Sequence, residues 1–165
     1  MTSTLRLSLG ALSLLSLLAT PALPLPARAF ERAEFFATCA GRLDAISAHA
    51  NARPIEESTE ISEIAAEFSL LLDAVLPDAL DEGVPKRAAR RWRTGGWVEI
   101  AHLLQEINYS FDAGRAARAA EALQARVQTC LTAVQPGAVV TWLPKIADPY
   151  GERRATDTPR VGLMP

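Results

Sequence analysis

The sequence has 165 residues, of which 49% are apolar and 22% are charged, and its 17 basic and 19 acidic residues give a formal net charge of −2. This length and apolar content suit one domain with a sizeable core. The slight acidic excess argues against a general binder of nucleic acid or of anionic membranes, because those partners attract proteins with an excess of Lys and Arg.

The first 29 residues have the composition of a cleavable secretory signal peptide. One basic residue, Arg6, precedes an apolar stretch over residues 7–19, and Ala27 and Ala29 form the small-residue pattern that signal peptidase accepts. The alternative is a membrane anchor, which needs about 20 apolar residues in a row. Prolines at positions 21, 24 and 26 interrupt the run before that length. We therefore expect cleavage and no stable membrane anchor.

The mature chain would begin near Phe30 and contain 136 residues, with 15 basic and 19 acidic side chains. No cysteine directly follows the cleavage pattern, which argues against a lipoprotein anchor. The chain is rich in Ala and Arg, as are proteins of GC-rich bacterial genomes, so the periplasm is the expected compartment, with secretion from the cell as the alternative. In this view the protein is exported, and its partners are exported too.

Two cysteines, Cys39 and Cys130, lie in the mature part. In an oxidising compartment an even number of cysteines predicts one disulfide, with two buried free thiols as the alternative. The sequence contains neither a Cys-x-x-Cys motif nor the Cys-x-x-Cys-His motif of covalent haem. A bridge between the two cysteines would therefore be structural.

Four segments carry apolar residues at the 3.6-residue spacing of a helix, and none alternates as a half-buried strand does. We expect helices over residues 31–50, 55–76, 86–109 and 112–134, with a connection over residues 77–85. Such short connections favour an up-and-down antiparallel four-helix bundle, an all-α fold, over residues 30–135. Gly95 and Gly96 each cost about 1 kcal/mol in a helix relative to alanine, so the third helix could kink or split there.

In an up-and-down bundle the first helix starts at the end where the fourth one finishes. Cys39 and Cys130 then lie at similar heights, within the uncertainty of the helix boundaries, on the predicted inner faces of these helices. We expect a disulfide that ties the first helix to the fourth.

Prolines and glycines punctuate residues 136–165, which predicts an irregular tail after the bundle. The apolar segment over residues 139–143 interrupts this polar tail. Either Trp142 folds back to cover the bundle, or the segment is an exposed docking peptide. From about residue 148 we expect disorder.

Glu99 and His102 form a Glu-x-x-His pattern on a helix, which carboxylate-bridged di-metal bundles use in pairs. The second pair is absent, because the only other histidine, His49, has Ile46 three residues before it. A mononuclear metal site that uses Glu99, His102 or Glu106 is a weak candidate, and a solvated, hydrogen-bonded helix face is the simpler interpretation. No arrangement for nucleophilic catalysis is evident, so we expect neither an enzyme nor a bound cofactor.

Charge is strongly segregated along the chain. Nine acidic residues and no basic one occur over residues 56–82, and five basic residues then follow without an acid. The simple interpretation is intramolecular, with the acids near the end of the second helix facing the arginines of the third: Asp73, Asp78, Asp81 and Glu82. Alternatively, a surface for an acidic partner or an anion is formed by Trp97 and four arginines, which are residue types enriched at binding hot spots: Arg87, Arg90, Arg91 and Arg93.

Three classes of function are compatible with these features. The first is a helical protein that acts by contact with an unidentified protein of the same compartment, as an adaptor, inhibitor or assembly factor. The second is a carrier or sensor of a small apolar ligand, held between the helices near Gly95 and Gly96 in a cavity lined by Phe36, Phe68, Trp92 and Gly96. The third, a metal protein or enzyme, has the least support, and nucleic acid is not an expected partner.

Overall fold

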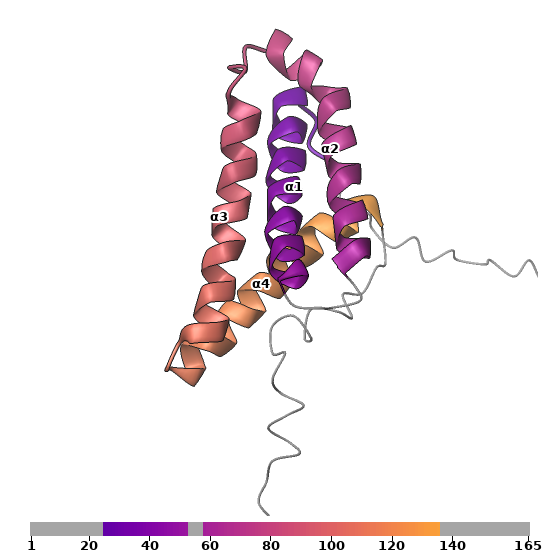
Figure 1. The fold of residues 1–165 in the computed structure, drawn as a ribbon. Helices are drawn as coiled ribbons and strands as arrows, with labels where there is room; N and C mark the ends of the chain where they lie inside the picture. Colours follow the sequence, from indigo (N-terminus) through magenta and orange to yellow (C-terminus); the bar gives the residue numbers. More distant parts are fainter. Residues whose placement is uncertain (1–24, 53–57, 136–165) are drawn as a thin grey trace, which may run out of the picture.

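The computed structural model describes residues 25–52 and 58–135, which form four helices and, within those ranges, no strand (Figure 1). The helices are α1 (Ala29–Asn51), α2 (Ser58–Asp81), α3 (Ala88–Tyr109) and α4 (Ala113–Val134). Successive helices alternate in direction, so the predicted all-α, up-and-down four-helix bundle is confirmed. Most of the proposed signal segment (residues 1–24) and the whole tail (residues 136–165, with Trp142) lie outside the described residues.

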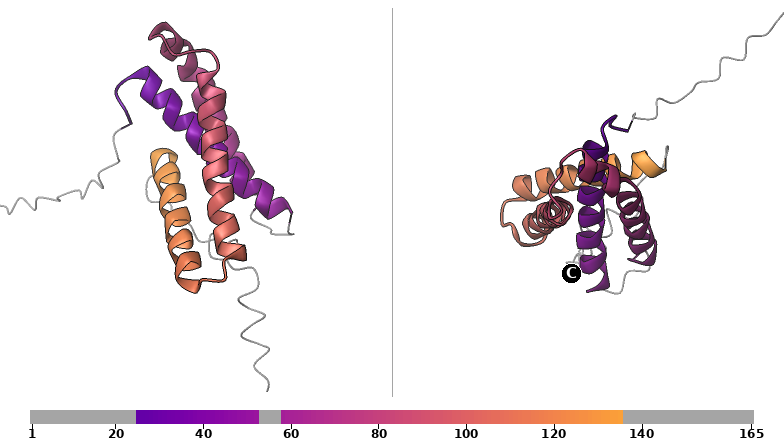
Figure 2. Two further views of the ribbon diagram at one scale, coloured as in Figure 1. Left: turned by 90° about the vertical axis from the view of Figure 1, so that its left-hand side faces the viewer. Right: turned by 90° about the horizontal axis from the view of Figure 1, so that it is seen from above.

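Helix α1 is the central helix of the bundle. In Figure 1, α2 and α3 flank α1 while α4 crosses behind it, and the right-hand view of Figure 2 shows α4 across one side of the other three helices. Helix α1 packs extensively against α2 and α3, whereas α2 and α3 barely touch each other. A square bundle would place α1 and α3 on a diagonal. Here they are neighbours, in a layer ordered α2–α1–α3 with α4 laid across one face.

Helix α1 can occupy the centre because many of the residues that it buries are small. Four of them recur at every fourth position and so share one stripe of the helix: Ala33, Ala37, Gly41 and Ala45. Larger side chains from all four helices fill the remaining core, and among the largest that are fully buried are Leu43, Ile46, Ile61, Phe68, Ile100, Leu123 and Val127. The small stripe lets neighbouring backbones approach α1 closely.

Two glycines bring α1 and α3 into backbone contact. Gly41 lies against the carbonyl group of Arg93, and Gly96 lies against the carbonyl group of Thr38, so a Cβ atom at either glycine would collide with the backbone of the other helix. Gly95 differs, because its Cβ would have no neighbour within 4 Å. Helix α3 is continuous through both glycines. The kink that their low helix propensity allowed is absent, since packing against α1 offsets that propensity.

Helix α2 is longer than expected, because it continues through Pro77 to Asp81. Pro77 has no N–H, so the carbonyl group of Asp73 has no helical donor. Both residues lie on the exposed side of α2, where water can donate to that carbonyl group. The helix ends instead in the turn at Gly83, two residues after Asp81, and this glycine has a positive φ of 93°. Its N–H donates to Leu80 O at 2.9 Å, and the N–H of Val84 donates to Ala79 O at 3.1 Å. This is the Schellman pattern.

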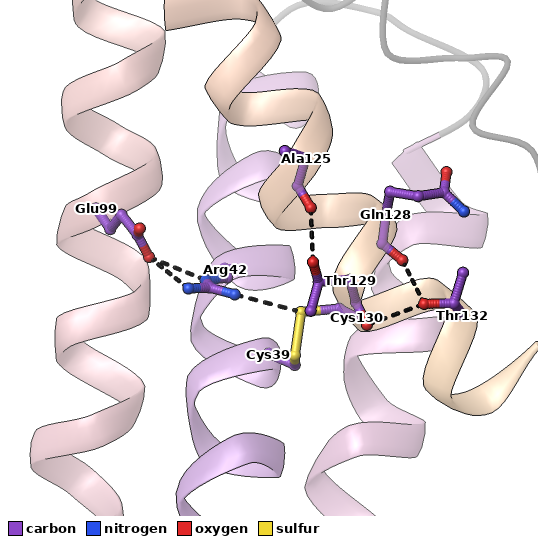
Figure 3. The surroundings of a disulfide bond; sticks show 8 residues. All are labelled: Cys39, Arg42, Glu99, Ala125, Gln128, Thr129, Cys130 and Thr132. Atoms are coloured by element: carbon purple, nitrogen blue, oxygen red, sulfur yellow. Dashed lines mark hydrogen bonds and ion pairs between the residues drawn. A yellow bond between two sulfur atoms is a disulfide. The ribbon is translucent and has the colours of Figure 1, made fainter. Parts of the chain in front are cut away.

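The disulfide between Cys39 of α1 and Cys130 of α4 is confirmed. Figure 3 shows this bond between the two helices. The two Cα atoms are 5.6 Å apart, and both side chains are fully buried. Helix α4 packs mainly on α3 and contacts α1 over a much smaller area. The disulfide is therefore the principal link between α1 and α4.

The adjacent glycines of α3 give a matched pair of substitutions. We expect Gly96→Ala to lower the free energy of unfolding by about 1–3 kcal/mol, because its methyl group overlaps the backbone of α1. Gly95→Ala, at an open position, should raise that free energy by up to about 1 kcal/mol through helix propensity. Urea denaturation of the oxidised protein measures both effects. Equal effects of the two substitutions would contradict the backbone contact.

Loss of the disulfide should destabilise the protein strongly. The bridge spans 91 residues of sequence, and restriction of a denatured loop of that length corresponds to at most about 4–5 kcal/mol. Cys39→Ser, Cys130→Ser or reduction should each lower the thermal midpoint. Unchanged midpoints under all three conditions would show that the bridge does not stabilise the bundle.

Candidate functional site

The side of the α2–α1–α3 layer opposite α4 is not covered by any described helix. Cys39 of α1 is bonded to α4, and Ala48 lies nine residues further on, two and a half turns of helix, so it faces the opposite side. Similarly, Glu99 of α3 pairs with Arg126 of α4, whereas Trp97 lies about 200° around the helix from Glu99. We call this uncovered side, which faces the viewer in Figure 1, the open face.

Two adjoining hollows shape the open face. The larger, of about 590 Å³, runs between α1 and α2 and is lined by residues that include Ala48, Asn51, Ser62, Ala66 and Leu70. The smaller, of about 290 Å³, lies beside α3 and is lined by Asp44, Arg90, Arg93, Thr94 and Trp97. Asp44 and Arg93 line both hollows. These two side chains separate the larger hollow from the smaller one.

Asp44 and Arg93 are joined by an ion pair across α1 and α3. Both Nε and Nη2 of Arg93 donate to Asp44 Oδ2 at 2.8 Å. The carbonyl group of the same arginine contacts Gly41, so the close approach of the two helices places the side chain of Arg93 over α1. Arg93 thus has its carboxylate partner within the molecule.

The remaining residues of the predicted partner surface share one exposed face of α3. We define the α3 ridge as the exposed side chains of Arg87, Arg90, Arg91, Thr94 and Trp97, which follow one another at helical spacing. Trp97 is 44% exposed. Within residues 25–52 and 58–135, no ion pair is found for the three ridge arginines.

The expected pairing of the acids of α2 with the arginines of α3 is wrong. Helix α1 lies between the two helices, so their charged side chains do not meet over most of their length. Glu82 instead accepts backbone N–H groups at the start of α1. The acidic residues of α2 and the basic α3 ridge therefore lie on separate surfaces of the molecule.

Glu99 is held by arginines from two other helices. Its Oε2 atom accepts from Arg42 Nε at 2.9 Å and Arg42 Nη2 at 2.8 Å, and its Oε1 atom lies 2.6 Å from Arg126 Nε. Figure 3 shows Arg42 between Glu99 and the disulfide, with Nη1 also 3.9 Å from Cys130 Sγ. This network links α1, α3 and α4 beside the covalent bridge.

The other two weak metal candidates do not join Glu99 in a site. His102 is exposed, and Glu106 lies 3.6 Å from Arg115. In the part of the chain that the structure describes, no group of three or more His, Cys, Asp or Glu side chains could hold a metal ion. Glu-x-x-His was a misleading signal here because the sequence pattern does not show the arginines that reach Glu99 from other helices.

The residues expected to line a ligand cavity include members of two different helix interfaces. Phe36 and Phe68 pack at the α1–α2 interface with ring centroids 6.2 Å apart, and Phe35 completes this aromatic cluster. Gly96 lies at the other interface, where the backbone of α1 fills the space that we expected to be free. Trp92 is partly buried against the core. Gly96 thus serves close helix packing, whereas Gly95 lies at an open position.

Comparison with known proteins finds no matching family model, no matching curated protein and no matching solved structure. Among the described helices, none is both long enough and apolar enough to cross a membrane. The features of the molecule that bear on function are therefore the open face, the α3 ridge and the disulfide.

Two carboxylates, Glu99 and Asp44, pair with arginines on opposite sides of the α1–α3 interface. They should differ in how much they contribute to the free energy of unfolding. Arg42 is 14% exposed, so Glu99→Gln leaves a mostly buried guanidinium short of an anionic acceptor and should cost about 1–3 kcal/mol. The Arg93–Asp44 pair is more exposed, and Asp44→Asn should cost less than about 1 kcal/mol. Chemical denaturation compares the two, and the reverse order would contradict this assignment.

Proposed function

We propose that this protein is exported, to the periplasm in a bacterial cell, and acts by binding another protein through the α3 ridge. The observation that carries the proposal is the half-exposed Trp97 next to arginines that have no ion-pair partner among the described residues, on a face that no described helix covers. Its role would be that of an adaptor, inhibitor or assembly factor. The partner would share its compartment.

The chemistry of the α3 ridge indicates what the partner presents. Trp97 offers a large apolar surface that gains free energy when it is removed from water. The nearby Arg90 and Arg91 can donate to carboxylates in a planar, two-pronged geometry. An acidic protein surface with an apolar pocket for one indole ring would satisfy both. Trp and Arg are also the residue types that dominate binding energy at protein interfaces.

Export is supported by two independent features. The disulfide joins two buried cysteines in the core, and such bridges persist in oxidising compartments. The first 29 residues have the pattern of a cleavable signal. Together they favour a site of action outside the cytoplasm.

The alternative, a carrier of a small apolar ligand near Gly96, has less support. Backbone atoms of α1 occupy the space beside that glycine. The hollows of the open face are shallow and are lined by Asp, Arg, Ser and Asn as well as by apolar groups. This surface is better suited to a protein partner than to an enclosed apolar ligand.

Site-specific photo-crosslinking in the producing cell tests the proposal. A photoreactive residue in place of Thr94, within the α3 ridge, should give a defined crosslinked protein, and the same residue in place of Glu121 of α4 should not. Trp97→Ala and Arg90→Glu should each reduce the yield of this adduct at least about tenfold, as expected for hot-spot residues.

Matched controls are available on the same molecule. Tyr109→Ala removes an exposed aromatic side chain at the far end of α3, and Arg118→Glu reverses an exposed charge on α4. Neither should change the adduct at position 94. Equal labelling from positions 94 and 121, or an adduct that persists in both ridge variants, would sink the proposed role of the α3 ridge.

A further inference from the structure

The start of α1 is held by a carboxylate from a distant part of the chain. Glu82 Oε1 accepts the N–H of Ala29 at 3.2 Å, and Glu82 Oε2 accepts the N–H of Phe30 at 3.0 Å. Arg28, the residue before the helix, makes no side-chain cap. One carboxylate, 52 residues away in sequence from Phe30, therefore caps the first two N–H groups of α1.

The position of Glu82 is fixed by the turn that ends α2. Its own N–H donates to Asp78 O at 3.0 Å, and the Schellman pattern at Gly83 follows directly. The bonds from Phe30 and Ala29 lower the pKa of the Glu82 carboxyl, with smaller contributions from Arg32 and Arg28. Glu82 is therefore an anion at neutral pH, presented to the nitrogen atom of Phe30.

The same nitrogen atom belongs to the peptide bond at which the sequence predicts cleavage. Ala27 and Ala29 form the recognition pattern, and hydrolysis after Ala29 would make Phe30 the first residue. Residues 25–28 lie outside α1, and Leu25, Ala27 and Arg28 are exposed. The predicted cleavage point thus coincides with the N-terminal end of the folded domain.

We propose that Glu82 is the binding site for the α-ammonium group that cleavage creates on Phe30, an inference that depends on the proposed export. An export peptidase adds one water molecule across the Ala29–Phe30 peptide bond. Ala29 leaves with a carboxylate, and Phe30 keeps the nitrogen as an ammonium group. Because this nitrogen already lies 3.0 Å from Glu82 Oε2, a hydrogen bond to a neutral amide becomes an ion pair without movement of either element.

The ion pair would offset the unfavourable positive charge that cleavage places at the start of α1. A positive charge at the N-terminus of a helix is unfavourable, because the free N–H groups there already carry partial positive charge. Cleavage also removes Arg28 and the carbonyl groups of Pro26 and Ala27, to which Arg32 Nη1 donates at 3.4 and 2.7 Å. Arg32 is thereby freed near the new terminus. Glu82 would compensate both positive charges.

The first step of the test is the mass of the protein recovered from the exported fraction. A chain that begins at Phe30 is expected. Absence of any cleaved, exported chain would overturn the export proposal together with this inference. A cleaved chain with another first residue would overturn this inference alone, and the proposed role of the α3 ridge would stand.

The second step uses purified oxidised chains and does not depend on export. Chains of residues 30–165 and 27–165 are each prepared with and without Glu82→Gln, so that the terminal ammonium group lies beside Glu82 in the first chain and away from it in the second. We expect the substitution to lower the thermal midpoint by about 3 °C more in the chain that begins at Phe30. Asp81→Asn neutralises the adjacent exposed acid and is the control. It should not lower the thermal midpoint of one chain more than that of the other.

Amine labelling gives a readout that helix capping alone would not change. The carboxylate favours the protonated, unreactive form of the Phe30 amine, so Glu82→Gln should speed acylation of this amine at pH 7 about threefold, measured by peptide mapping with lysine labelling as the internal reference. Equal midpoint losses in both chain lengths, or an unchanged labelling rate, would reduce Glu82 to an ordinary helix cap and overturn the proposal.

Discussion

The structure depends on the backbone contact between α1 and α3 at Gly41 and Gly96. This contact makes α1 a shared neighbour of α2 and α3 and so replaces a square bundle by a layer with an open face. It also keeps the acidic residues of α2 apart from the basic residues of α3. The exposure of the α3 ridge therefore follows from two interior glycines, which have no side chain to hold the helices apart.

Much of the fold could be predicted from the sequence, because apolar spacing reports helical periodicity directly and two cysteines are enough to form one bridge. The four helices and the Cys39–Cys130 bridge are confirmed. The order of packing could not be predicted, since Gly96 has the same local signal whether it faces a cavity or another helix. The end of α2 could not be predicted either, because proline usually ends a helix, and only the structure shows that Pro77 and Asp73 lie on the exposed side of α2.

The candidate site was predicted in part. The helical spacing of Arg87, Arg90, Arg91 and Trp97 was enough to place them on one face, and the structure does so. The partners of Arg93 and Glu99 come from other helices, so no local pattern in α3 could reveal Asp44, Arg42 or Arg126. Likewise, the contact of Glu82 with the start of α1 follows from tertiary proximity alone.

The disulfide also divides the chain into a covalent ring and two free arms. The ring runs from Cys39 to Cys130 and contains the segments of α2 and α3, so these segments stay within one closed loop when the oxidised protein unfolds. The first ten residues of α1 lie outside the ring, on an arm that can fray without opening it. Glu82, a member of the ring, holds the first turn of that arm, so the start of the central helix is attached to a residue that the ring itself constrains.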